Sequence, residues 1–162
     1  MKKSQLPQLL FAVILLAGAG FGFYRFLRED SGISEQTFFY DLSAKKLFAA
    51  PREALPPIRG VDNPEADAVR AIVICVSGNP AKEANRRIAY LEKYTPELKR
   101  SLELVRAGKA EPLPRGQRKG YVFVKRAEDN DWFRSDSPEG EQIMNDWNVP
   151  GPDGKMPIVC VP

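Results

Sequence analysis

The chain of 162 residues contains no histidine. This absence excludes the Ser-His-Asp and Cys-His nucleophile systems, histidine-ligated zinc and haem sites, and the usual general base near neutral pH. The chain also has only 2 cysteines, which cannot supply the four thiolates of a zinc or iron–sulfur site within one chain. We therefore expect no enzymatic activity, no metal and no cofactor.

The chain also has little net charge, only +3. So small an excess does not indicate a nucleic-acid binder, and we expect no nucleic-acid partner. The 43% hydrophobic and 28% charged residues are ordinary for a globular protein and exclude wholesale disorder. The length leaves room for one compact domain.

The amino-terminal region carries the clearest signal in the sequence. Lys2 and Lys3 precede an apolar stretch, and residues 6–27 would span roughly 33 Å as a helix, enough to cross a hydrocarbon core of about 30 Å. Arg25 lies inside this stretch and can reach the lipid head groups beside its aromatic neighbours. We predict a single transmembrane helix that contacts lipid through residues 6–27.

A cleaved signal peptide is the alternative for this region, because Ala17-Gly18-Ala19 resembles a signal-peptidase site. Both interpretations divide the chain into residues 1–30, an anchor or signal, and residues 31–162, one domain outside the cytoplasm. Positive charges at the two ends of the stretch balance and do not fix its orientation. The short tail before the stretch favours a single-pass membrane protein with the domain on the extracytoplasmic, periplasmic side.

Two glycines in the predicted anchor have the spacing of a helix-packing motif. Gly18 and Gly22 form one G-x-x-x-G pair among other small residues. Small side chains let a second helix approach closely, so a homodimer could form through this face.

Residues 31–162 show short strand-like runs separated by prolines. We expect strands over 37–42 and 47–50, joined as a hairpin through Ser43–Lys46, and further strands at 71–76, 121–124, near 132–133 and at 157–161. We expect helices starting at Pro80, Pro96 and Pro138 after capping residues, and a polar loop over 109–119. The fold class is α+β, with a mainly antiparallel sheet and two or three helices.

The first of these helices depends on a spacing argument. Asn79 can cap a helix with Pro80 at its first position, and Ala84, Ile88 and Leu91 recur at helical intervals. The strand-to-helix turn before it lacks the glycine pattern of a phosphate loop, so we interpret it as an ordinary helix start.

Both cysteines lie inside strand-like apolar runs. If the strands of Cys75 and Cys160 are neighbours in an oxidising compartment, the two residues could form a disulfide. The alternative is two buried free thiols that act as small hydrophobic residues.

Charge is segregated along the domain. Residues 86–126 hold twelve basic and four acidic residues, whereas residues 127–146 carry a net charge of −6. Such a pair of blocks could orient docking on a partner. Asp129, Asn130, Asp131 and Asp136 do not match a calcium-loop spacing, so we predict no metal there. The candidate interaction surface consists of Lys99, Arg100, Arg106, Lys109, Arg115, Arg118 and Lys119.

Together these observations favour a membrane-anchored, non-enzymatic protein-interaction module, an accessory or scaffolding subunit of a larger envelope complex. The alternative is an extracytoplasmic domain that binds a small ligand or cell-wall material, which an aromatic pocket near Trp132 and Trp147 would favour over a filled core. A hydrolase would need two acids facing each other across a cleft, and the spacing of the acids marks no such pair.

Overall fold

The computed structural model describes residues 16, 18–21, 24, 34–61 and 64–162. The chain divides into two compact units, Met1–Ile33 and Ser34–Pro162. In the first unit the described residues are helical and exposed, including Leu16 at 74% and Phe21 at 68%. No helix within the described part of the chain has the length and hydropathy to cross a membrane. Most of the predicted span over 6–27 lies outside the described residues.

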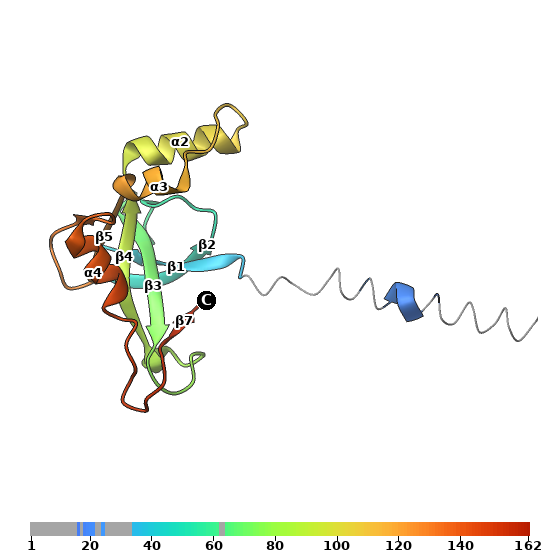
Figure 1. Ribbon diagram of the computed structural model, residues 1–162, viewed down its shortest axis with the longest axis vertical. Coiled ribbons are helices and arrows are strands. Elements are labelled where there is room, and N and C mark those ends of the chain that lie inside the picture. The colour runs from blue at the N-terminus through green and yellow to red at the C-terminus, as the bar shows by residue number, and fades with distance from the viewer. Residues whose placement is uncertain (1–15, 17, 22–23, 25–33, 62–63) are drawn as a thin grey trace, which may run out of the picture. The chain divides into compact units, whose positions relative to one another are not determined.

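The second unit is built on an antiparallel sheet, as the sequence predicts. The strands run in the order β2-β1-β3-β4-β5-β6, and β7 pairs with β3 beside β1 (Figure 1). All of the pairings are antiparallel. The strand bounds are β1 Gln36–Asp41, β2 Lys46–Pro51, β3 Ala68–Cys75, β4 Arg86–Tyr94, β5 Val122–Lys125, β6 Phe133–Arg134 and β7 Ile158–Cys160.

The predicted hairpin is confirmed, and a buried carboxylate stabilises its turn. Strands β1 and β2 pair from Gln36 with Pro51 to Asp41 with Lys46. The fully buried Asp41 carboxylate accepts hydrogen bonds from the backbone N–H of Ala44 at 2.8 Å and of Val61 at 2.9 Å. One side chain therefore joins the hairpin turn to the loop that leads into β3.

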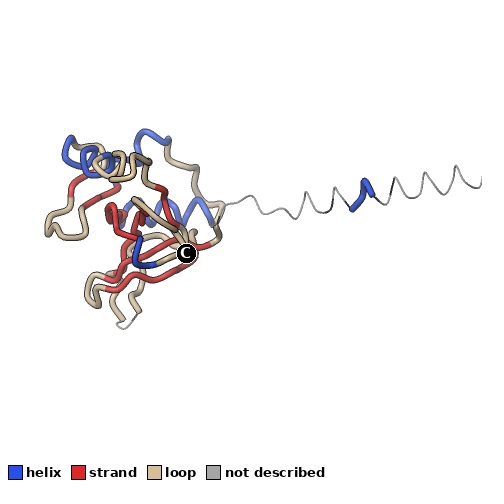
Figure 2. Tube along the Cα trace, turned by 90° about the horizontal axis from the view of Figure 1, so that it is seen from below, coloured by secondary structure: helices blue, strands red, loops and turns tan. Residues whose placement is uncertain are grey.

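Helices α2 and α3 lie at one end of the sheet and α4 lies beside β5 (Figure 1), and Figure 2 draws the helices in blue as seen from below. Two of the predicted starts are confirmed, because Thr95 caps α2 by accepting from Leu98 N–H at 3.2 Å and Ser137 caps α4 by accepting from Gly140 N–H at 3.1 Å. The expected polar loop over 109–119 contains a short helix instead. The helix bounds are η1 Glu83–Asn85, α2 Pro96–Arg106, α3 Arg115–Arg118, η2 Lys119–Tyr121 and α4 Pro138–Asn145.

The helix predicted from Pro80 to Leu91 is wrong. Only a single 3-10 turn forms there, and Arg86–Tyr94 is the strand β4, which pairs with β3 on one side and with β5 on the other. The apolar spacing resembled a helix because the register shifts between Ile72 and Val73, which adds one residue to β4. Tertiary pairing outweighs the local capping signal, since β3 needs a hydrogen-bonded neighbour along this edge.

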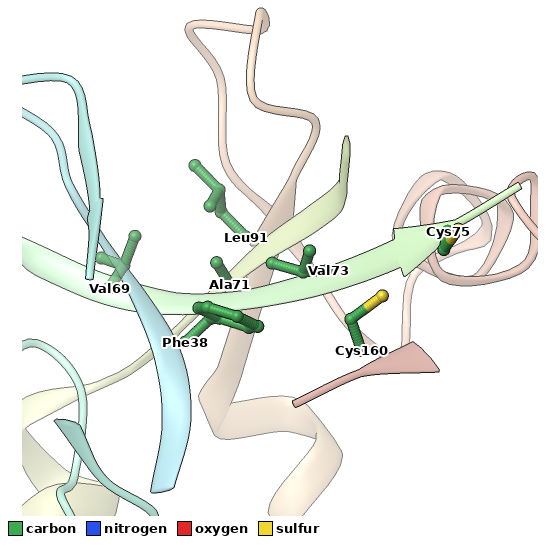
Figure 3. Packing of buried hydrophobic residues seen from close by; sticks show 7 residues of the cluster. All are labelled: Phe38, Val69, Ala71, Val73, Cys75, Leu91 and Cys160. Carbon is green, nitrogen blue, oxygen red and sulfur yellow. The ribbon is translucent and has the colours of Figure 1, made fainter. Parts of the chain in front are cut away.

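The core lies along β3, whose alternate side chains enter one hydrophobic cluster. Figure 3 shows Val69, Ala71 and Val73 following one another on this face. Trp132 packs against the edge of the cluster and is half-buried. The cluster consists of Phe38, Val69, Ala71, Val73, Cys75, Leu91 and Cys160. Burial of apolar area stabilises by about 25 cal/mol per Å², so this cluster contributes to the stability of the domain together with other fully buried side chains such as Phe39, Ile74 and Leu98.

Candidate functional site

A groove with aromatic walls lies where the end of β4 meets β5 and the start of α2. It has a volume of about 450 Å³. Its lining consists of Pro57, Lys93, Tyr94, Thr95, Pro96, Lys99, Phe123 and Trp132, and we name it the Trp132 groove.

The pairing of β4 with β5 places Phe123 and two lysines on the same face of the sheet. Lys93 on β4 pairs directly with Phe123 on β5, and Leu91 pairs with Lys125. Side chains two positions apart on a strand share a face, so these four residues lie on the face against which Trp132 packs. The groove therefore continues the face of the sheet that carries the hydrophobic core, at a place where the described residues leave this face partly open.

Hydrogen bonds to the carbonyls of Pro56 and Pro57 hold one wall of the groove. Tyr94 N–H donates to the Pro56 carbonyl at 3.2 Å, and the Lys99 ammonium donates to the Pro57 carbonyl at 2.7 Å. Both bonds attach the loop after β2 to the junction of β4 and α2. This attachment gives the groove a wall whose backbone is fixed before any ligand arrives.

Two ammonium groups lie over the indole ring of Trp132. Lys93 Nζ is 4.3 Å from the ring centroid and Lys125 Nζ is 5.3 Å from it. Both distances fall within the range of cation–π attraction. Burial, followed by the charge of Lys125, lowers the pKa of Lys93 below its ordinary value of 10.5. The groove therefore carries concentrated positive charge beside apolar surface.

The opposite face of the sheet carries a half-buried polar cluster around Arg70 of β3. The Arg70 guanidinium donates through Nη1 to Tyr94 Oη at 2.9 Å, and Nη1 lies 3.5 Å from Glu92 Oε1. The burial of Glu92 raises its pKa, and this effect is larger than the lowering caused by the positive charge of Arg70. Burial, with the charge of Glu92, also raises the pKa of Tyr90 to about 12. Arg70 Nη2 donates to the carbonyls of the loop after β2, at 3.1 Å for Ala54.

Other hollows of similar size have different charged linings. One of about 490 Å³ is lined by Phe38 and Arg86, but Arg86 Nε donates to the Pro80 carbonyl at 2.8 Å and its guanidinium carbon lies 5.3 Å from the Phe38 ring centroid. Another, of about 480 Å³, is lined by the acidic loop after β5.

The acidic loop makes internal ion pairs. Arg126 pairs with Asp129 at 3.6 Å and with Asp146, and Arg134 pairs with Asp136 at 2.7 Å. Among the described residues no group of three or more metal-ligating side chains is found.

The predicted basic surface lies on α2, α3, η2 and the loop between α2 and α3. Lys99 lines the Trp132 groove, whereas Arg100 lines a separate hollow with Leu104. Arg106 donates to the Glu53 carbonyl, and Arg118 donates to the Leu113 carbonyl at 3.2 Å. The other members are the exposed Lys109 and Lys119, and Arg115, whose backbone lies in α3.

The two cysteines lie on neighbouring strands but are offset. Cys160 pairs with Val73 and Cys75 pairs with Ile158, so the cysteines are diagonal neighbours across the ladder. Both cysteines are buried free thiols. The pKa of Cys160 is raised mainly by burial and, to a smaller extent, by the charge of a neighbouring Cys75 thiolate. Diagonal positions are roughly 7–8 Å apart, beyond the usual Cα separation of a disulfide. A bridge would therefore require the two strands to shift, and the disulfide stays a prediction.

The glycine pair of the predicted anchor is described only in part. Gly18 lies in the helical piece of the first unit, and an added Cβ would meet no atom within 4 Å. Gly22 lies outside the described residues, so the predicted packing face stays a prediction.

Sequence reasoning considered an aromatic pocket near both tryptophans and did not identify Lys93, Phe123 or Lys125 as a group. Trp132 lines the groove and packs against the core cluster, whereas Trp147 is half-buried with an indole N–H that has no hydrogen-bond partner among the described residues. The signal that could have found the groove is the alternation of Leu91 and Lys93 with their strand partners, which appears only when 86–94 is treated as a strand. Comparison with known proteins found no matching family model, no matching curated protein and no matching solved structure.

Proposed function

We propose that this protein is a membrane-anchored, non-enzymatic interaction module, and that the Trp132 groove docks an extended segment of a partner protein. In this proposal residues 6–27 hold the chain in the membrane, and the domain from residue 34 onward faces the extracytoplasmic side. The protein then acts as an accessory or scaffolding subunit of a larger membrane complex.

The groove is the single observation that carries the proposal. Proteins that recognise extended, proline-containing segments use shallow grooves lined by aromatic rings, because such segments lose little conformational entropy on binding. The groove here combines the rings of Phe123 and Trp132 with Pro57 and Pro96. Aromatic side chains of this kind are frequent binding hot spots, since they bury a large area with few rotatable bonds.

The chemistry of the lining supports binding rather than catalysis. Its ionisable side chains are two lysines and a tyrosine, and one of the lysines, Lys99, is hydrogen-bonded to a backbone carbonyl. The Tyr94 hydroxyl is engaged by Arg70 on the opposite face of β4. A general acid–base pair or an activated nucleophile would need a second polar group aimed at the same point.

A small-ligand site is the second candidate, and the same groove favours it. The volume of about 450 Å³ lies within the range of small-molecule sites. An aromatic pocket near Trp132 is the feature that distinguishes this alternative from a filled core. The two candidates differ in what stays bound to the protein after extraction from native membranes.

The test is gentle detergent extraction of native membranes, followed by size separation and mass spectrometry of the chains that migrate with this protein. The variant is Trp132→Ala, and the matched control is Tyr121→Ala, which removes an aromatic ring that is 42% exposed and outside the groove lining. We expect one defined assembly for the wild type and the control, and its loss for Trp132→Ala. Migration of the wild type alone, with a small molecule retained, would favour the ligand-binding candidate.

The anchor is tested separately by alkaline carbonate extraction and by the intact mass of the purified chain. We expect the full-length chain to remain in the membrane pellet and Ile14→Lys to release it, because a charge at the centre of a span is costly. A chain that lacks residues 1–19 and is released by carbonate would establish the signal-peptide alternative.

A further inference from the structure

Lys93, in the lining of the Trp132 groove, and Lys125, just outside that lining, are two like charges with no anionic partner among the described residues. Lys93 and Lys125 both lie over the Trp132 ring, with Nζ at 4.3 Å and 5.3 Å from its centroid. Neither lysine forms an ion pair with any residue that the structure describes. Lys125 is only 9% exposed, and its ammonium donates to the Asp129 carbonyl at 2.7 Å.

Two neighbouring ammonium groups repel each other, and partial burial strengthens the repulsion. The effect is visible at Lys93, whose pKa is lowered by burial and then by the charge of Lys125. The indole ring compensates only in part, because a cation–π contact at a half-exposed site is weaker than a charge-assisted hydrogen bond to an anion. An anion beside Lys93 would relieve this repulsion.

We propose that the Lys93–Trp132–Lys125 cluster is the acid-selecting end of the groove and binds the side-chain carboxylate of an Asp or Glu in the docked segment. This inference rests on the proposed function and adds the chemical class that the groove recognises. The apolar part of the groove would hold a proline or aliphatic residue of the same segment, since its walls are Phe123 and the two prolines.

Charge complementarity selects a carboxylate over other occupants. Lys99 adds a third ammonium to the lining, and the Glu92 carboxylate belongs to the opposite face of β4 with Arg70. Lysine ammonium groups form charge-assisted hydrogen bonds with carboxylates, and such bonds are stronger than neutral ones. A neutral segment would leave both ammonium groups without a counter-charge, so the groove should discriminate against it.

The experiment is a selection of displayed random octapeptides on the full chain in dodecyl maltoside. Parallel selections use Lys93→Met, which keeps the aliphatic stem, Trp132→Ala, and Lys46→Met as a matched control on the exposed end of β2. We expect wild type and Lys46→Met to enrich peptides with an Asp or Glu at a fixed distance from a proline or aliphatic residue. We expect Lys93→Met to lose the acid, and Trp132→Ala to recover no consensus.

Affinities of one enriched peptide give the quantitative check. Replacing its acid by the matching amide should weaken binding to wild type about tenfold, as expected for one charge-assisted hydrogen bond, and should leave binding to Lys93→Met unchanged. A thermal melt of each variant tests that it is folded, and Lys125→Met gives a second removal of charge from the same cluster.

Each other result overturns a specific part of the proposal. A wild-type consensus without an acid would overturn the carboxylate site and leave the docking function in place. A wild type that recovers no peptide dependent on Trp132 would overturn both. Loss of acidic peptides when phosphatidylglycerol is added to the micelles, with weaker phosphatidylglycerol binding by Lys93→Met, would assign the cluster to a lipid head group instead.

Discussion

Arg70 on β3 donates to the hydroxyl of Tyr94 on β4 at 2.9 Å. Tyr94 follows Lys93 directly, and consecutive side chains on a strand point to opposite faces. The bond therefore fixes the end of β4 from one side of the sheet, while Lys93 extends into the Trp132 groove. The position of the groove depends in this way on Arg70, which bonds the lining residue Tyr94 but does not itself line the groove.

Removal of the Arg70 guanidinium should destabilise the domain. Arg70→Met loses the bonds to Tyr94 and to the Arg52 and Ala54 carbonyls and leaves the buried Glu92 without its cation. We expect the free energy of unfolding at neutral pH to fall by about 3 kcal/mol. Urea denaturation measures this change, and Arg87→Met on the exposed side of β4 should remain close to wild type. An equal stability of both variants would contradict the structural role.

Glu92 should make stability depend on pH. Burial raises the pKa of Glu92 above its ordinary value of 4.5, so the folded state holds this proton more tightly than the unfolded state. The contribution of Glu92 to the free energy of unfolding is therefore fully present below pH 4.5, and it is lost as the pH rises through the pKa of Glu92 in the folded state. Glu92→Gln removes the titration, so its stability should rise relative to wild type between about pH 4 and pH 7. Urea denaturation across that range measures the difference, and parallel curves would disprove it.

Lys125 should control the protonation of Lys93. The charge of Lys125 contributes to the lowered pKa of Lys93, after burial. Lys125→Met keeps the aliphatic packing against Trp132 and removes the charge, so the pKa of Lys93 should rise toward 10.5. An NMR titration of the Lys93 Nζ and Cε resonances measures this shift. Lys109→Met, which changes an exposed lysine outside the groove, serves as the control and should leave the titration unchanged.

Gly140 should not tolerate a side chain. A Cβ added at this residue of α4 would lie 1.9 Å from the Arg134 carbonyl oxygen, which belongs to rigid backbone in β6. We expect Gly140→Ala to reduce the free energy of unfolding by about 2–3 kcal/mol. The matched control is Gly116→Ala in α3, where an added Cβ meets nothing within 4 Å and the change should stay within about 1 kcal/mol. Circular dichroism during urea unfolding compares the two, and a tolerated Gly140→Ala would mean that α4 can move away from β6.

Local signals in the sequence predicted much of the fold. The hairpin of β1 and β2 follows from two apolar runs around a polar turn, and the caps at Thr95 and Ser137 mark α2 and α4. These elements agree with the structure because their stabilising contacts lie within a few residues. Strand β4 could not be predicted in the same way, since its pairing with β3 and β5 is non-local and its bulge imitates helical spacing.

The candidate site was less accessible to sequence reasoning for the same physical reason. Trp132 and Lys125 are close in sequence, but Lys93 reaches them only through the pairing of β4 with β5. A basic run gives no indication of which of its members shares a face with an aromatic ring. The predicted basic surface lies on and between α2 and α3, where several side chains bond to nearby carbonyls.

The pairing of β7 with β3 means that the sheet cannot finish folding until the last strand has been synthesised. Strand β7 covers Val73, Ile74 and Cys75, yet it is synthesised after every other strand of the sheet. A chain still emerging from the ribosome can form the hairpin and α2, but the second half of β3 has an open edge until Ile158–Cys160 appears. Such long-range closure slows folding and exposes an apolar edge meanwhile. In a nascent chain the edge of β3 at Val73–Cys75 therefore stays without its strand partner until Ile158–Cys160 is synthesised.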